Sequence, residues 1–294
     1  MKTHCIVPCE NRFGKLIDMR RGTLKGNEIA TVVLQSNEKY SNEERMNVLS
    51  EVVESILEKC SGNGVILFPG GMFSTGENEP RTYYNEVEEA VKRILCKTER
   101  NIVVCVGIDG SVDVEGYAHD QIGIAVSRKG IEAIGRKFHP APQEKGRVKC
   151  ADTHSSEEDG KSRIFELNGI KYFMCVCYDT YGVRHKNLPN SGVDVVLNLV
   201  HCFYPKGKGP SGDPYFARHG FAGASKQWKC PVFGTAVFFN REIPERWPSG
   251  VYWNQGDKST QKWKYEYNPL KPSRDILEVE IPEGKAMVRI YDLF

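Results

Sequence analysis

The sequence predicts an α/β protein in which helices cover β-sheets. Short apolar runs of strand-forming residues alternate with amphipathic helical segments in the first third of the chain, and further strand-like runs follow to its end. Buried strands separated by amphipathic helices are typical of helix layers packed on sheets. The 294 residues contain no internal repeat, linker or low-complexity tract, so we expect a single domain.

The first half of the chain alternates between strand and helix. Residues 1–27 are polar and basic and are expected to form an extension or a hairpin. Ser41 and Glu44 are capping residues for a helix, because apolar side chains recur at helical spacing from Met46 to Leu57. The other elements predicted here are strands over 28–34, 65–68 and 101–108, a helix over 81–96, and paired strands over 121–127 and 131–137.

The second half of the chain is richer in strands. Residues 140–163 are charged and poor in apolar side chains, which predicts a long loop of the kind that often carries function. Asn168-Gly169 is a strong signal for a β-hairpin turn. The other elements predicted here are strands over 163–167, 171–177, 193–200, 232–239, 275–281 and 286–291, a short helix or turn over 180–189, a glycine-interrupted helix over 217–229, and an irregular aromatic region over 247–272.

The composition is that of an ordinary globular protein. Hydrophobic residues make up 40% and charged residues 27%, and a net charge of +2 is too small for the basic surface that nucleic-acid or membrane binding needs. The ten cysteines are scattered, as expected of free thiols in a reducing compartment. No secretory signal and no apolar run of roughly 18 residues is seen. We therefore expect a cytoplasmic protein without a nucleic-acid or membrane partner.

Phosphate and metal sites are poorly supported. Residues 160–162 (Gly-Lys-Ser) resemble the end of a phosphate-binding loop, but Ser155 stands where that motif needs its first glycine. Two groups have residue types that ligate metals: His4 with Cys5 and Cys9, and Cys150 with His154. Neither group has paired C-x-x-C spacing. We expect neither a metal nor another cofactor.

The segment over residues 173–182 carries the clearest chemical signal. A β-prone run ends at Cys177 and then turns through Tyr178 and Asp179, which is how a strand presents a nucleophile at its tip. Cys175 lies on the same face of the strand, where a disulfide with Cys177 would be strained, so both are expected to be thiols. Asp179 is expected to orient the turn by accepting hydrogen bonds from backbone N–H groups.

Three short motifs resemble those of the nitrilase superfamily of carbon–nitrogen hydrolases, whose members carry catalytic Glu, Lys and Cys residues in that order. Residues 176–179 (Val-Cys-Tyr-Asp) match the cysteine motif, and residues 135–140 (Gly-Arg-Lys-Phe-His-Pro) match the lysine motif. Residues 67–70 (Leu-Phe-Pro-Gly) match the first motif, which reads V-F-P-E in the family. Gly70 thus stands where the family has glutamate. The resemblance covers roughly residues 28–240.

The resemblance implies a four-layer α-β-β-α sandwich, in which two sheets pack face to face with helices outside. It also implies a homo-oligomer, because family members commonly associate through the helix near the nucleophile. The usual C-terminal G-x-S-x-I…P-x-G segment is not recognisable after Asn240. We therefore expect one carbon–nitrogen-hydrolase-like domain over residues 1–294, with an N-terminal extension over 1–27 and a divergent segment over 241–294.

The resemblance assigns catalysis to Cys177 and Lys137. A free cysteine, with a pKa of about 8.5, is only a few per cent ionised at pH 7, and a nearby ammonium favours both the thiolate and the oxyanion. A third group must protonate the leaving amine and activate water, and losing such a group costs on the order of 10²–10⁴-fold in rate. Glu144 is preferred for this role, because the family often has a second glutamate there. The other candidates are Glu77, Glu79, His139 and His201.

Two further residues are expected to contact substrate. His201 follows the strand over 193–200 and should reach the rim of the sheet, where substrate-contact residues of the family lie. Tyr178 either contacts substrate or packs beside Cys177.

Two functions fit these residues. The first is an amidase-type hydrolase, in which Cys177 attacks a small amide-like substrate or a nitrile and forms a thioester. The second is a catalytically impaired nitrilase-like protein whose pocket binds a small ligand or a partner. Gly70 favours the second function, whereas Lys137 and Cys177 favour the first. Acyl transfer to an amine is a third option.

Overall fold

The computed structural model describes residues 27–37, 40–112, 116–205, 212–245, 247–253, 268–272 and 276–293. The N-terminal extension, the candidate metal ligands His4, Cys5 and Cys9, and most of the aromatic region over 247–272 lie outside these residues.

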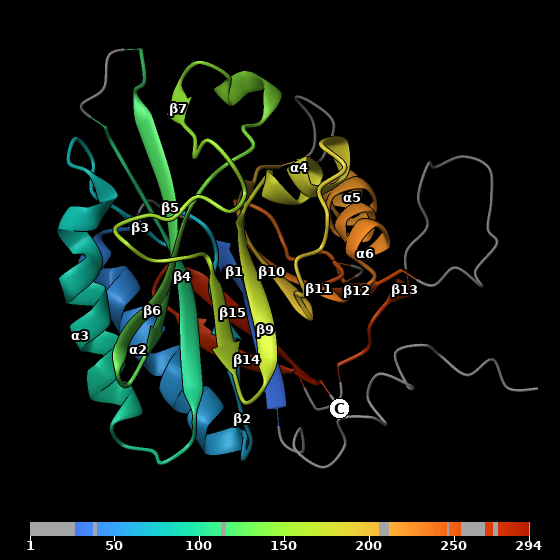
Figure 1. Cartoon of the computed structure of the whole chain (residues 1–294). Helices are drawn as coiled ribbons and strands as arrows, with labels where there is room; N and C mark the ends of the chain where they lie inside the picture. Colours follow the sequence, from blue (N-terminus) through green and yellow to red (C-terminus); the bar gives the residue numbers. More distant parts are fainter. Residues whose placement is uncertain are drawn as a thin grey trace, which may run out of the picture.

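One hydrogen-bonded path of strands runs through the molecule (Figure 1). Its strands are β1 (Asn27–Ser36), β2 (Asn63–Leu67), β4 (Ile102–Gly110), β5 (His119–Ser127), β6 (Gly130–Arg136), β8 (Ile164–Leu167), β9 (Ile170–Val176), β10 (Val195–Phe203) and β11 (Val232–Phe239). Their order is β6-β5-β4-β2-β1-β11-β10-β9-β8. The other strands flank this path: β3 (Phe73–Ser74), β7 (Val148–Lys149), β12 (Gly250–Tyr252), β13 (Asn268–Pro269), β14 (Leu277–Ile281) and β15 (Gly284–Asp292).

Strand direction determines where the ends of the strands meet. The neighbours from β4 through β9 on this path pair in parallel, and β6 points the same way as β4 because each is antiparallel to β5. Parallel strands deliver their C-terminal ends to one edge. The ends of β2, β4, β6, β9 and β10 therefore share an edge.

Strand β1 joins two facing sheets. Residues 27–31 of β1 pair with β2, residues 34–36 pair with β11, and β15 runs antiparallel along its other side. A buried apolar layer lies between the facing sheets, with Cys105 and Ala125 contributed by one sheet and Tyr172, Met174 and Leu197 by the other.

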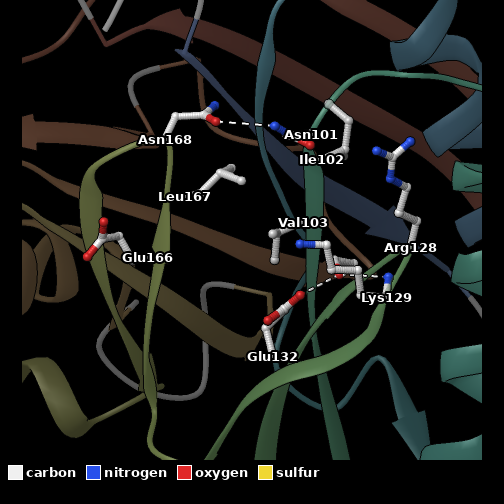
Figure 2. Close-up of a pocket in the computed structure, with 10 residues that line it drawn as sticks. Asn101, Ile102, Val103, Arg128, Lys129, Glu132, Glu166, Leu167 and Asn168 are labelled. Atoms are coloured by element: carbon white, nitrogen blue, oxygen red, sulfur yellow. Dashed lines mark hydrogen bonds between the residues drawn. The ribbon is translucent and has the colours of Figure 1, made fainter. Parts of the chain in front are cut away.

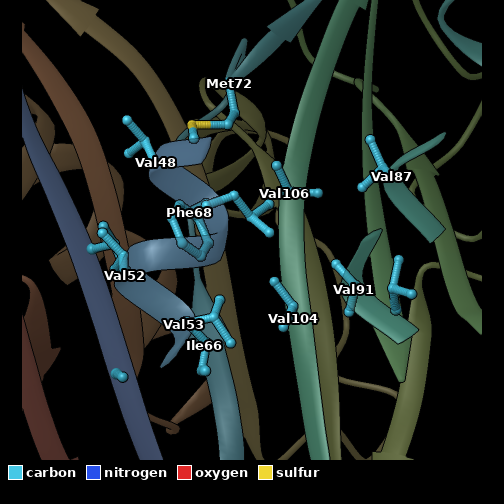
Figure 3. Close-up of a cluster of buried hydrophobic side chains, with 14 of the residues drawn as sticks. Val48, Val52, Val53, Ile66, Phe68, Met72, Val87, Val91, Val104 and Val106 are labelled. Atoms are coloured by element: carbon cyan, nitrogen blue, oxygen red, sulfur yellow. The ribbon is translucent and has the colours of Figure 1, made fainter. Parts of the chain in front are cut away.

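Helices cover the outer faces of both sheets (Figure 1). The helices are α2 (Asn42–Lys59), α3 (Tyr84–Leu95), α4 (Asp179–His185), α5 (Gly212–Tyr215), a π-helical turn (Phe216–Phe221) and α6 (Ala222–Trp228). Figure 3 shows valines of α2 and α3 packed on Ile66, Phe68 and Val104 of the first sheet. On the second sheet, Trp228 of α6 packs on Phe173 of β9 with ring centroids 4.8 Å apart. The expected four-layer α-β-β-α arrangement is confirmed.

Local sequence signals explain where two elements begin and turn. Ser41 caps α2: its hydroxyl accepts a hydrogen bond from the Glu44 N–H, and the Glu44 carboxylate accepts one from the Ser41 N–H. Asn168 and Gly169 both have positive φ, +51° and +78°, as a tight hairpin between β8 and β9 requires. The helix cap and the hairpin are confirmed.

Several boundaries differ from the sequence prediction. The helix expected over 81–96 starts with a 3₁₀ turn (Pro80–Tyr83), and α3 follows it. The loop over 140–163 contains a 3₁₀ turn (Pro142–Glu144) and β7. The helix expected over 217–229 begins earlier and contains the π-helical turn. Among the described helices, none combines the length and apolar character that crossing a membrane requires.

Gly107 of β4 allows a close approach of the turn at Gly70 and Gly71. A Cβ on Gly107 would lie 2.5 Å from Gly70 Cα and 2.8 Å from Gly71 N, both backbone atoms. The Gly107 N–H donates to Pro69 O at 3.1 Å, and the Gly70 N–H donates to Val200 O at 3.1 Å. The turn is thus held between β4 and β10.

We predict that Gly107→Ala lowers the free energy of unfolding by about 1–3 kcal/mol, because backbone must move to admit the methyl group. Gly123→Ala is the matched control. Gly123 pairs with Gly107 on β5, but its Cβ would meet the flexible side chain of Met174, at 3.1 Å. Urea unfolding of both variants measures the difference, and equal stability of the two would contradict the prediction.

Candidate active site

Polar side chains from different strands gather at the shared C-terminal edge of the sheets. Asp109 ends β4, Lys137 follows β6, Cys177 follows β9 and His201 lies near the end of β10. The turn containing Gly70 follows β2. The structure thus brings Cys177, Lys137 and His201 to one edge.

Cys177 occupies a sharp turn between β9 and α4. Its φ is +51°, which is uncommon for a residue with a side chain and persists only where the surroundings impose it. Its N–H donates to Leu199 O at 2.8 Å, and its carbonyl accepts from the side chain of Asn198 at 3.1 Å. Both partners lie on β10, so the neighbouring strand fixes the turn. The half-buried thiol is thereby presented at the tip of β9.

Asp179 ties this turn to the chain that follows β6. One carboxylate oxygen accepts from the N–H groups of Phe138 and His139, at 2.8 and 2.9 Å. The other oxygen accepts from the Val176 N–H at 3.0 Å and from the buried guanidinium of Arg163 at 3.1 Å. Asp179 therefore orients the turn by accepting hydrogen bonds from backbone N–H groups, as the sequence predicted.

Lys137 is fully buried and held by two side chains. Its ammonium donates to Glu144 Oε2 at 2.6 Å and to Gln121 Oε1 at 2.7 Å. Burial opposes its charge, but the nearby Cys177 thiolate and the Glu144 carboxylate outweigh burial and raise the pKa of Lys137. Lys137 is therefore a fixed cation beside Cys177.

The Cys177 thiol lies in a field that favours the thiolate. Burial alone would raise its pKa, but the Lys137 ammonium and the imidazole of His201 outweigh burial and lower the pKa of Cys177. Two other cysteines show the opposite behaviour. Burial raises the pKa of Cys150 to about 11, and it raises the pKa of Cys175 well above its usual range. Cys177 is thus distinguished from its neighbours as a nucleophile.

The remaining predicted residues have varied surroundings. The Tyr178 ring stacks on Tyr181 with centroids 4.3 Å apart, which is a packing contact. Burial and nearby cations lower the pKa of His139 to about 4, so this imidazole is neutral at pH 7. Glu77 is exposed, and Glu79 forms an ion pair with Arg81. Glu144 lies beside Lys137 and accepts a hydrogen bond from its ammonium.

Sequence reasoning missed Asp109 and Gln121. Asp109 accepts a hydrogen bond from the His201 imidazole at 2.9 Å, and Gln121 holds the Lys137 ammonium. The available signal for Asp109 was its position, because it is a carboxylate at the C-terminal end of an apolar strand. Gln121 carries no comparable signal, since a polar residue within a strand usually faces solvent.

A cavity of about 220 Å³ lies at the opposite edge of the sheets (Figure 2). The start of β4, the β5–β6 turn and the β8–β9 hairpin form its walls. The residues that line it are Asn101, Ile102, Val103, Ser127, Arg128, Lys129, Glu132, Glu166, Leu167 and Asn168. Strand β9 separates this cavity from Cys177 by roughly 20 Å, at 3.3 Å per strand residue. The cavity is therefore distinct from the candidate active site.

Comparisons with known proteins identify the fold. No protein-family model and no curated protein matches the chain. A mutant amidase from Nesterenkonia sp. AN1, with acrylamide added to its active-site cysteine, has a TM-score of 0.56 and 11% identity, covering 89% of this chain and 92% of that chain. A cysteine-to-serine mutant of the Nesterenkonia AN1 amidase, described as from the nitrilase superfamily, also has a TM-score of 0.56 and 11% identity, covering 90% and 91%. The chain thus has the fold of a nitrilase-superfamily amidase.

We predict that iodoacetamide at pH 7 modifies Cys177 before Cys150, because a thiolate is the reactive form. Lys137→Met should slow modification of Cys177 roughly fivefold or more, since the neutral side chain no longer favours the thiolate. Lys145→Met, which removes an exposed lysine from the same loop, is the control and should leave the rate unchanged. Peptide mass spectrometry measures each rate, and equal rates for Cys177 and Cys150 would contradict the prediction.

Proposed function

We propose that this chain is a carbon–nitrogen hydrolase of amidase type, related to the nitrilase superfamily, with Cys177 as its nucleophile. The observation that carries the proposal is the pairing of a strand-tip cysteine, in a strained turn, with the buried ammonium of Lys137. Structural lysines are rarely buried, because burial penalises the charge unless a partner compensates it. Here Glu144 and Gln121 compensate Lys137 while its charge remains beside the thiol.

In this mechanism, the Cys177 thiolate attacks the carbonyl carbon of an amide, and negative charge develops on the carbonyl oxygen. Lys137 stabilises that charge. Collapse of the tetrahedral intermediate expels the amine and leaves a thioester on Cys177. Water then releases the acid.

Glu144 supports this mechanism through Lys137. Its carboxylate accepts hydrogen bonds from the Lys137 ammonium at 2.6 Å and from the Ala141 N–H at 2.7 Å. These contacts orient the ammonium and balance its charge. We therefore assign Glu144 to positioning Lys137, whereas the sequence had favoured it as the proton carrier.

The proposed substrate is a small amide. A structural neighbour, the Nesterenkonia AN1 amidase, has been observed with acrylamide. The aromatic side chain of Tyr178 beside Cys177 is a proposed substrate contact. Association into a homo-oligomer, the single-domain plan and a cytoplasmic location remain predictions, and light scattering of the purified chain tests the first.

We predict that p-nitrophenyl acetate acetylates Cys177 and that a panel of small primary amides releases ammonia. Cys177→Ala should abolish both reactions. Lys137→Met should lower kcat/KM on the order of 10²–10³-fold, because an oxyanion-stabilising charge is lost. Intact-mass spectrometry and an ammonia assay provide the measurements.

The two main hypotheses give different results in this experiment. If Cys177 reacts with iodoacetamide but no ester or amide forms an acyl-enzyme, the hydrolase proposal fails. That result would favour a ligand-binding protein with a reactive thiol.

A further inference from the structure

We propose that His201 transfers the protons in this reaction and that Asp109 positions its imidazole. This inference rests on the proposed function, because it identifies the proton carrier that a cysteine hydrolase requires. The sequence offers no carboxylate at Gly70 for that role, and the structure places an imidazole in the corresponding space.

The turn at Gly70 and Gly71 makes room for the imidazole. A Cβ on Gly70 would lie 2.7 Å from the backbone oxygen of Leu199 and 2.9 Å from both Nδ1 and Cε1 of His201. A Cβ on Gly71 would lie 3.1 Å from Cδ2 of His201 and 2.9 Å from Oδ2 of Asp109. Contacts under 3.0 Å are essentially never made by real Cβ atoms, so a side chain at either position would displace its neighbours. The two glycines therefore admit the His201 ring and the Asp109 carboxylate together.

The two nitrogens of His201 have different surroundings. Nε2 lies 2.9 Å from Asp109 Oδ1, whereas Nδ1 is buried and has no hydrogen-bond partner of standard geometry among the described residues. A buried polar atom without a partner costs about 1–3 kcal/mol. The imidazole and the Cys177 thiol lie close enough for each to influence the charge of the other. Because Asp109 occupies Nε2, Nδ1 is the nitrogen left for Cys177, and in this proposal it faces the thiol. The carboxylate, imidazole and thiol are then arranged in a row.

The backbone of β10 is irregular around His201, and this irregularity sets the direction of the His201 side chain. The pairing register of β10 with β11 shifts between Leu199 and Cys202, so His201 lies in a β-bulge, a feature that redirects side chains. Leu199 O accepts from the N–H of Cys177, and Val200 O accepts from the N–H of the Gly70 turn. The same segment of β10 therefore holds the nucleophile and the glycine turn on either side of the imidazole.

Glu144 is poorly suited to carry the proton. Its Oε2 accepts from Lys137 and from the Ala141 N–H, and its Oε1 accepts from Gln121 at 3.4 Å. Burial opposes ionisation of Glu144, but Lys137 outweighs burial and lowers the pKa of this carboxyl. A carboxylate whose oxygens already accept hydrogen bonds and whose pKa is lowered is a poor carrier of protons. This leaves the imidazole for the role.

Charge favours a thiolate–imidazolium pair. Burial opposes the charge on His201, but Asp109 and the Cys177 thiolate outweigh burial and raise the pKa of the imidazole. The thiol has a lowered pKa, and both shifts favour placing the proton on His201 rather than on Cys177. The titratable and charged groups that interact electrostatically with this pair are Asp109, Lys137, Glu144, Tyr178 and Tyr181.

The reaction then balances in two steps. In the first, a bond forms between Cys177 Sγ and the carbonyl carbon, the carbon–nitrogen bond breaks, and the leaving nitrogen takes the proton from His201 Nδ1. In the second, the neutral imidazole takes a proton from water as the water oxygen attacks the thioester. Collapse breaks the carbon–sulfur bond, releases the acid, and restores the thiolate and the imidazolium. Asp109 keeps Nδ1 directed at Sγ throughout.

We predict two effects of His201→Gln, measured with probes that need no knowledge of the natural substrate. Iodoacetamide modification of Cys177 at pH 6–7 should slow roughly tenfold or more, because the cation that favours the thiolate is lost. After reaction with p-nitrophenyl acetate, acetyl-Cys177 should accumulate, with deacylation slowed on the order of 10²–10⁴-fold. The phenolate leaves without a proton, so acylation by this ester should be affected less than deacylation.

Asp109→Asn is the second variant, because it retains the size of the side chain and tests positioning. It should shift the pH profile of Cys177 modification toward higher pH and slow deacylation by a smaller factor than His201→Gln. His119→Gln, at an exposed position on β5, is the control and should match the wild type. Thermal unfolding of each variant checks that it is folded.

Failure of the inference is distinct from failure of the proposed function. If wild-type Cys177 forms an acyl-enzyme, and folded His201→Gln and Asp109→Asn deacylate at the wild-type rate, the role of His201 is refuted while the hydrolase stands. If wild-type Cys177 forms no acyl-enzyme and its pH profile is the same in His201→Gln, both proposals fail.

Discussion

The site depends on one carboxylate that accepts four hydrogen bonds. Asp179 accepts hydrogen bonds from the backbone N–H groups of Phe138, His139 and Val176 and from the guanidinium of Arg163. Hydrogen bonds to an ionised acceptor are about twice as strong as neutral ones. They join two chain segments that belong to different sheets, the one after β6 and the one at the end of β9. Without this link, nothing local to either segment would hold the lysine beside the cysteine.

A second constraint is steric. Gly70 and Gly107 let a turn, a strand and an imidazole approach more closely than any side chain would permit. A side chain at position 70 would meet both the backbone carbonyl of Leu199 and the His201 ring, so this turn leaves no room for a glutamate beside the imidazole. The missing glutamate at position 70 weakened the hydrolase hypothesis at the sequence level. In the structure, the glycine at that position leaves space for the His201 ring.

The sequence predicted what local patterns encode. The cap at Ser41, the hairpin at Asn168-Gly169 and the strand before Cys177 all depend on neighbouring residues, and the structure confirms them. The Asp109–His201 pair spans 92 residues and arises only because β4 and β10 deliver their ends to one edge. Each residue could be placed at a strand end from the sequence, but their pairing leaves no local signal, and neither residue belongs to the motifs that suggested the family.

The two cations of the site have different tasks because their environments differ. Lys137 is fully buried, and the Glu144 carboxylate stays beside its ammonium when the reaction consumes the Cys177 thiolate, so its charge persists and can stabilise an anion. Asp109 and the thiolate raise the pKa of His201, but an imidazole titrates far closer to neutrality than an ammonium, so losing the thiolate matters more for its charge. When Cys177 becomes a thioester, that stabilisation disappears and the pKa of His201 falls. The imidazole therefore more readily loses its proton at the thioester stage, when a base is needed to activate water.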